Sequence, residues 1–148
     1  MSERIRKIIV ALSLLGVGIA SYLSWTKFTD TAAFCANIGD CSVVQNSAYA
    51  YLMGIPVAYL GLLAYLIILA VALFNLRATP EQRSWSDLLL FALVVGGFTF
   101  SAYLTYIELF ILYEFCIWCM ASFFNLIVLT ALTAPAALGA APELELET

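Results

Sequence analysis

The sequence contains no histidine and few charged residues, which make up 11 % of its 148 residues. Without histidine, the chain lacks a side chain that commonly binds haem and catalytic zinc. It has no glycine-rich dinucleotide fingerprint and no region large enough for a flavin domain. The net charge of −4 argues against a nucleic-acid partner. These absences argue against several common classes of soluble enzyme and against DNA or RNA binding.

Apolar residues dominate what remains. They account for 64 % of the chain, and the mean hydropathy is +1.01, whereas soluble proteins are about half apolar. A transmembrane helix needs about 20 apolar residues, so the chain has room for four of them. We therefore predict an all-α integral membrane protein, a bundle of four transmembrane helices that forms a single membrane domain over residues 1–148.

Polar stretches divide the chain into four predicted spans, at about residues 8–25, 55–76, 86–106 and 115–133. The first connection, residues 26–53, is the largest loop. Its second half, Ser42 to Leu52, has neither glycine nor proline and is predicted to form a short helix in the membrane interface. Pro135 and Gly139 are expected to end the last helix, which leaves an acidic tail at residues 140–148.

The basic residues predict the orientation of the bundle. Five of the six lie at the N-terminus or between the second and third spans: Arg4, Arg6, Lys7, Arg77 and Arg83. Because cytoplasmic loops carry an excess of Lys and Arg, both termini are expected in the cytoplasm, with the protein crossing the membrane several times. The loop at residues 26–53 and the start of the fourth span then lie on the external face.

The four cysteines form two close pairs, Cys35 with Cys41 in the loop and Cys116 with Cys119 at the start of the fourth span. The predicted topology brings both pairs to the external face, next to an oxidising compartment where disulfides persist. A thiol in the first turn of a helix is more readily ionised. Neighbouring thiol pairs exchange electrons through mixed disulfides, so we predict a relay from the mobile loop pair to the fixed pair.

The electrons need an acceptor that a small membrane protein can reach. A membrane quinone accepts two electrons and can approach Cys119 from the lipid, because Cys119 lies one helical turn deeper than Cys116. Three aromatic residues near this position, Phe115, Trp118 and Phe123, are candidates to contact a flat ring. An interfacial belt of aromatic residues would give the same pattern.

Several motifs occur in a characteristic order. They are Cys35 and Cys41 with five residues between them, Ser47, the sequence Gly54-Ile55-Pro56, and the CxxC of Cys116-Ile117-Trp118-Cys119. Over about residues 8–134 the chain resembles the vitamin K epoxide reductase family, in its prokaryotic branch, which implies a multi-pass protein of the inner or plasma membrane of a prokaryotic cell. The resemblance implies a four-helix bundle around a quinone of the menaquinone, ubiquinone or vitamin K type, and an enzyme that generates disulfides.

The resemblance also implies a role for each cysteine. Cys119 would react with the quinone, Cys116 would exchange with Cys41, and Cys35 would meet a reduced thioredoxin-like protein on the external side. Ser47 matches a serine that the family associates with the quinone region. Many prokaryotic relatives carry a fused thioredoxin-like domain that this chain lacks, so the partner is expected to be a separate molecule and the protein a monomer.

One position departs from the family pattern. Phe123 stands where the animal enzymes have a tyrosine that can hydrogen-bond the quinone, four residues after the second cysteine of the CxxC. The resemblance therefore implies the loss of a polar contact at Phe123. Simple quinone reduction is expected rather than reduction of vitamin K epoxide.

Other interpretations remain for four cysteines in a membrane protein. A DsbB-type protein uses the same chemistry, but its CxxC lies in the first external loop, the reverse of the order here. A metal-ion carrier or sensor could bind a soft ion through four thiolates, although the middle of the central spans lacks the Asp, Glu or His of most ion pathways. Two structural disulfides are a third interpretation. Metal analysis and the redox state of the cysteines in a quinol-producing membrane would distinguish these classes.

Overall fold

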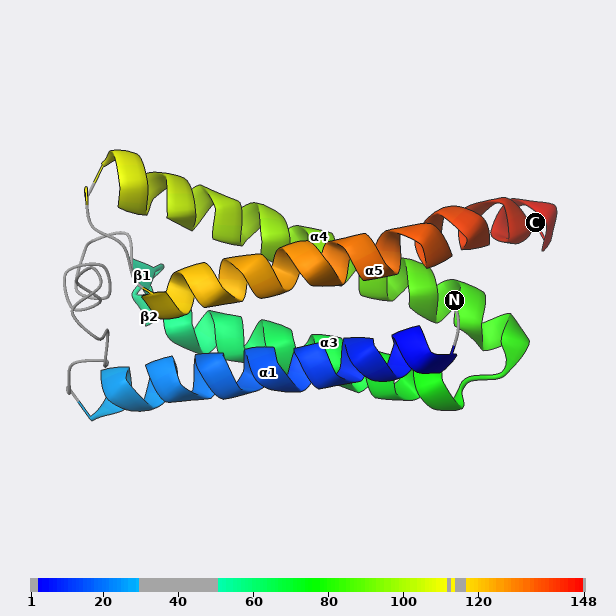
Figure 1. Cartoon of the computed structure of the whole chain (residues 1–148), viewed down its shortest axis with the longest axis horizontal. Helices are drawn as coiled ribbons and strands as arrows, with labels where there is room; N and C mark the ends of the chain where they lie inside the picture. The colour runs from blue at the N-terminus through cyan, green and yellow to red at the C-terminus, as the bar shows by residue number, and fades with distance from the viewer. Residues whose placement is uncertain (1–2, 30–50, 112, 114–116, 148) are drawn as a thin grey trace.

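Four long helices run alongside one another in the computed structural model, which describes residues 3–29, 51–111, 113 and 117–147 (Figure 1). The helices are α1 (Glu3–Phe28), α3 (Val57–Arg77), α4 (Pro80–Phe110) and α5 (Ile117–Glu147). Each contains a stretch that is long and apolar enough to cross a membrane. The predicted all-α bundle of four transmembrane helices is confirmed.

The helices alternate in direction and pack as two pairs. α1 lies mainly against α3, and α4 mainly against α5, while contacts between α3 and α4 and between α1 and α5 join the pairs. As Figure 1 shows, α1 and α4 end at the same end of the bundle at which α3 and α5 begin. This end, which we call the cysteine end because Cys119 lies there, also carries the hairpin of β1 (Tyr51–Leu52) and β2 (Ile55–Pro56).

The hairpin connects directly to α3. Its strands pair in antiparallel register, with Tyr51 opposite Pro56. Between them, Met53 and Gly54 have φ values of 55° and 83°, the left-handed conformation that a two-residue hairpin turn requires and that glycine adopts without strain. The ammonium group of Lys27, at the end of α1, lies 4.5 Å from the centre of the Tyr51 ring. This cation–π contact holds the hairpin against α1.

The helices extend beyond the predicted membrane spans, as the start of α4 and the end of α5 show. α4 begins at Pro80 rather than at about residue 86, because Thr79 and Gln82 form a capping box in which each side chain accepts a hydrogen bond from the other residue's backbone N–H. α5 continues through Pro135 to Glu147, so the prediction that Pro135 and Gly139 end this helix is wrong. A proline removes a single backbone hydrogen bond, and transmembrane helices tolerate that loss.

The predicted interfacial helix from Ser42 to Leu52 lies almost entirely outside the described residues. Its last two residues, Tyr51 and Leu52, form strand β1, so a helix there cannot extend as far as predicted. The hairpin lies at the point where the chain enters the bundle.

The buried core draws on all four helices: Ile9 and Ala20 of α1, Tyr65, Ile68 and Ala72 of α3, Leu90 and Val94 of α4, and Leu126 and Leu129 of α5. Large apolar side chains on the outer faces, such as Leu14, Leu63 and Phe124, are more than half exposed and would face lipid. Because lipid is as apolar as these side chains, close packing and internal polar contacts must hold the helices together. Gly16 allows one such contact, since a methyl group there would overlap the ring of Tyr65.

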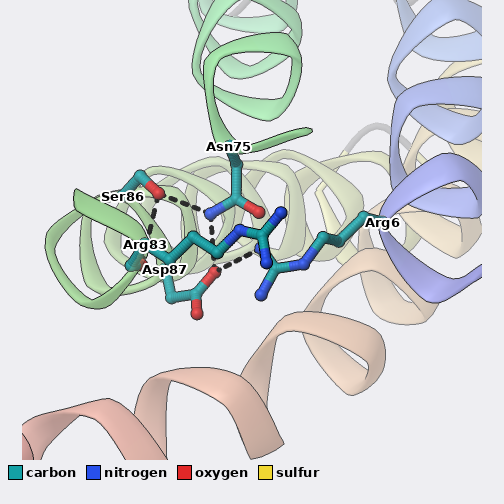
Figure 2. A network of polar contacts seen from close by, with 5 residues as sticks. All are labelled: Arg6, Asn75, Arg83, Ser86 and Asp87. Atoms are coloured by element: carbon teal, nitrogen blue, oxygen red, sulfur yellow. Dashed lines mark hydrogen bonds and ion pairs between the residues drawn. The ribbon is translucent and has the colours of Figure 1, made fainter. Parts of the chain in front are cut away.

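A buried polar network joins α1, α3 and α4 at the opposite end of the bundle (Figure 2). The Asp87 carboxylate accepts a hydrogen bond from the Arg6 guanidinium at 3.3 Å and another from the Asn75 amide at 2.6 Å. The Asn75 amide also donates to the Ser86 hydroxyl, which donates to the backbone carbonyl of Arg83. Arg6 and Asp87 are 6 % and 7 % exposed. The sequence analysis treated Arg6 as a cytoplasmic flanking charge, whereas its side chain is paired inside the bundle.

Candidate functional site

A cavity of about 200 Å³ lies inside the cysteine end of the bundle. Residues of all four helices line it, among them Ile19 and Leu23 of α1, Gly61 and Ile68 of α3, Phe100 and Leu104 of α4, and Cys119 and Leu126 of α5. On α3 the lining runs from Val57 to Ile68, which corresponds to about 17 Å along the bundle axis. The walls are mostly apolar, as is usual for a site that binds a small organic molecule.

Cys119 belongs to this wall. It lies in the first described turn of α5, is half-buried, and packs against Ile19 and Leu23 of α1. Backbone N–H groups in the first turn of a helix have no partner within the helix, and the helix dipole there favours a negative charge. Cys119 therefore combines a position at the start of a helix with direct contact to an apolar cavity.

The structure describes only three of the predicted site residues. Cys119 is one of them, and Trp118 and Phe123 are the others; the remaining five, Cys35, Cys41, Ser47, Phe115 and Cys116, lie outside the described residues. The relay between the cysteine pairs therefore stays a prediction.

The two described aromatic candidates flank Cys119 without lining the cavity. Trp118 packs against Tyr22 of α1, with ring centres 4.7 Å apart. Phe123 stacks on Phe98 of α4, with ring centres 5.6 Å apart. Contact of these two residues with a quinone stays a prediction, and in this structure their rings meet other aromatic side chains.

Two polar residues of the cavity wall were missed in the sequence analysis. Tyr65 of α3 is 5 % exposed, and its hydroxyl lies 2.7 Å from the Ser122 hydroxyl of α5. Both residues line the cavity. Helical spacing could have found Ser122, because a residue three positions after Cys119 lies on the same face of α5. No local pattern singles out Tyr65, since its partner lies 57 positions along the chain.

Glu108 of α4 also belongs to the cavity wall, where it is 2 % exposed. Ser101 and Thr105 line the cavity too, and their spacing from Glu108 places all three on one face of α4. This polar stripe on an apolar helix was the available signal, because ionisable residues within a membrane helix generally face its interior and mark functional sites.

The sequence model of the Vitamin K epoxide reductase family matches residues 7–134. The chain belongs to this family. The match covers both cysteine pairs and most of the helical bundle, and it makes the protein a membrane thiol–disulfide oxidoreductase. Members of the vitamin K epoxide reductase family generally use quinones, and the cavity fits such a molecule: apolar walls suit a flat ring, and hydroxyl groups and the thiol of Cys119 suit its carbonyl oxygens.

Proposed function

We propose that this member of the vitamin K epoxide reductase family generates disulfides, passing electrons from a separate, reduced thioredoxin-like protein to a membrane quinone of the menaquinone, ubiquinone or vitamin K type. The observation that carries the proposal is the position of Cys119 in the wall of an apolar cavity inside the membrane bundle. A thiol placed there can reach a lipid-soluble acceptor. A thiol needed only for a structural disulfide would have no use for such a cavity.

In the proposed sequence of steps, Cys35 and Cys41 oxidise the partner on the external side, with both termini of the protein in the cytoplasm. The reduced loop pair then exchanges with Cys116 and Cys119 through a mixed disulfide. A bound quinone would be the final acceptor and would take up two electrons and two protons. For each cycle, two S–H bonds of the partner are lost and one S–S bond forms. Glu108 adds a buried carboxyl group to the cavity wall.

The seam between α3 and α4 is the proposed passage for the quinone. Ala64 lines the cavity and is also exposed, so the cavity opens there. The neighbouring lining residues Gly61, Gly97 and Ser101 are small, and contacts between the two helix pairs, including those of α3 with α4, are less extensive than contacts within each pair. A lipid-soluble molecule can therefore enter from the membrane while its ring approaches Cys119.

Filling the cavity should block the quinone without unfolding the protein. Gly61 lines the cavity, and a β-carbon there would meet nothing within 4 Å, so we expect Gly61→Leu to raise the KM for quinone by at least about tenfold, which corresponds to about 1.4 kcal/mol. The thermal unfolding temperature should not fall, because leucine favours the helix over glycine. Quinone titrations in proteoliposomes and thermal unfolding in detergent would measure the two quantities.

Gly18→Leu is the matched control for this substitution. Gly18 also has open space around its β-position, but it lies on an exposed face of α1 and does not line the cavity. Its kinetics should match the wild type. Equal kinetics for the two variants would remove the cavity as the quinone site.

The proposed function is tested by anaerobic assay of the purified protein in proteoliposomes. A reduced thioredoxin-like protein is added together with ubiquinone or menaquinone, and quinone absorbance and partner thiols are followed in parallel. We expect two thiols to be lost for each quinone reduced. Failure of every quinone to accept electrons, or stoichiometric metal in the purified protein, would favour the metal-binding alternative instead.

A further inference from the structure

A chain of hydrogen bonds in the cavity wall has no role in thiol exchange. The Tyr65 hydroxyl lies 2.7 Å from the Ser122 hydroxyl, and the Asn125 amide donates to the Tyr65 oxygen at 3.5 Å and to the backbone carbonyl of Leu12 at 3.1 Å. Tyr65 and Asn125 are 5 % and 6 % exposed. These hydrogen bonds thus connect α1, α5 and α3. They end at the cavity, because Tyr65 and Ser122 both line it.

The donors in this chain can be ordered toward the cavity. The amide nitrogen of Asn125 can only donate, so the Tyr65 oxygen accepts from it. The Tyr65 hydroxyl lies 2.7 Å from the Ser122 hydroxyl, where either group can donate, and 3.4 Å from the Ser122 backbone carbonyl, to which it can donate instead. When Tyr65 donates to the Ser122 hydroxyl, the Ser122 proton is left for an acceptor in the cavity. Ser122 lies one helical turn after Cys119 on the same face of α5, and both residues line the cavity. A hydroxyl donor and the thiol therefore face the same space.

Packing fixes the tyrosine ring in place. Gly16 of α1 lies so close to the ring of Tyr65 that even a methyl group would overlap it, so the ring fills the space that a side chain at Gly16 would take. On its other side the hydroxyl is held by Ser122 and Asn125. The donor is consequently positioned before any ligand arrives, which reduces the cost of binding.

We propose that Ser122 donates a hydrogen bond to a carbonyl oxygen of the bound quinone, and that Tyr65 acts through Ser122 to position this donor. This inference rests on the proposed function and names the polar contact that orients the quinone ring beside Cys119. A donor to that oxygen stabilises the charge that builds up as the oxygen accepts electrons. Among the neighbouring lining residues, Ile68, Gly97 and Leu126 are apolar, and the polar stripe of Ser101, Thr105 and Glu108 lies on α4. Ser122 is therefore the hydroxyl donor on the face of α5 that carries Cys119.

The test measures the quinone carbonyl directly, without turnover. Quinone labelled with ¹³C at its carbonyl positions is added to the fully oxidised protein in lipid, and the infrared carbonyl band is compared with that of the same quinone in lipid alone. In the wild type we expect a shift to lower frequency. Ser122→Ala should abolish this shift, and Tyr65→Phe should weaken it. The dissociation constant, measured by equilibrium binding, should rise by about three- to tenfold in Ser122→Ala, as expected for one hydrogen bond.

Two substitutions provide matched controls. Tyr103→Phe removes a hydroxyl from a tyrosine that is 55 % exposed on α4 and does not line the cavity. Ser13→Ala removes a buried hydroxyl that donates to the backbone carbonyl of Ile9 on its own helix. Both should keep the wild-type carbonyl band. A shift that persists in Ser122→Ala would overturn this inference alone, whereas a wild-type protein that binds no quinone would overturn the proposed function with it.

A purely structural role has a different outcome. If Tyr65 and Ser122 only tie α3 to α5, Tyr65→Phe and Ser122→Ala will lower the unfolding temperature while the carbonyl band and the dissociation constant stay at their wild-type values. That result would also overturn the inference.

Discussion

Replacing Cys119 by alanine is expected to reduce quinone turnover by at least about 1,000-fold, the scale seen when a reacting nucleophile is removed. Cys119 is the described thiol that lines the membrane cavity, so no other described side chain can take its place in covalent chemistry there. Exchange between Cys35, Cys41 and the reduced partner should continue in this variant, because those steps precede Cys119 in the proposed relay. Stopped-flow absorbance of the quinone and acid trapping of mixed disulfides would measure the two reactions separately.

Cys35→Ala provides the complementary result. This variant should no longer oxidise the thioredoxin-like partner, yet a small dithiol that reaches Cys116 directly should still drive quinone reduction. If Cys119→Ala and Cys35→Ala had the same effect on quinone reduction and on partner oxidation, the separate roles proposed for the two cysteines would be wrong. Full quinone turnover in Cys119→Ala would remove the relay itself.

The four spans could be predicted because each depends on a local property, a run of apolar residues as long as the membrane is thick. The helix ends could not be predicted in the same way. Hydropathy predicts only the part of α4 that is apolar enough to lie in lipid. The helix itself begins earlier, at Pro80, because the side chains of Thr79 and Gln82 cap its first turn. At the other end of the chain, the prediction treated Pro135 as a terminus, although α5 continues on both sides of it.

Only part of the cavity wall could be predicted from the sequence. The CxxC spacing is a local pattern, and it singled out Cys119 as a candidate. The aromatic candidates were chosen by their closeness to Cys119 in the sequence, without regard to which face of the helix they occupy. Each residue turns an α-helix by about 100°, so the face that carries Cys119 continues through Ser122 and Leu126, which line the cavity. Phe123, one residue further round, meets Phe98 instead. The wall therefore offers a hydroxyl at Ser122 where the prediction expected aromatic contact.

Tyr65 and Asp87 could not be predicted, because their importance depends on residues far away in the sequence. Tyr65 meets Ser122 and Asn125 across the bundle. Asp87 pairs with Arg6, which lies 81 positions earlier. The composition shows that the chain has few charged residues. A charged side chain buried in a membrane protein needs a partner of opposite charge. The sequence did not show that Arg6 is the partner of Asp87.

Asp87→Ala is expected to be the most destabilising substitution considered for this protein. The Asp87 carboxylate compensates the buried Arg6 guanidinium and accepts a hydrogen bond from Asn75, and Figure 2 shows the guanidinium of Arg83 near that of Arg6. Its removal leaves a buried charge without a counter-ion, which typically costs about 3–5 kcal/mol. Thermal unfolding and titration with a denaturing detergent would both measure the loss.

Two comparisons separate the buried ion pair from a general effect of charge. Glu3→Gln removes the carboxylate of the Glu3–Lys7 pair, whose side chains are 78 % and 67 % exposed, and solvent screening should leave the stability of that variant unchanged. The double variant Arg6→Met with Asp87→Leu removes both buried charges, so it should recover most of the stability that Asp87→Ala loses. A double variant as unstable as Asp87→Ala would mean that Asn75 and Ser86, rather than the ion pair, hold this end of the bundle. Because the network lies at the end opposite Cys119, the KM for quinone should stay at its wild-type value in every variant that remains folded.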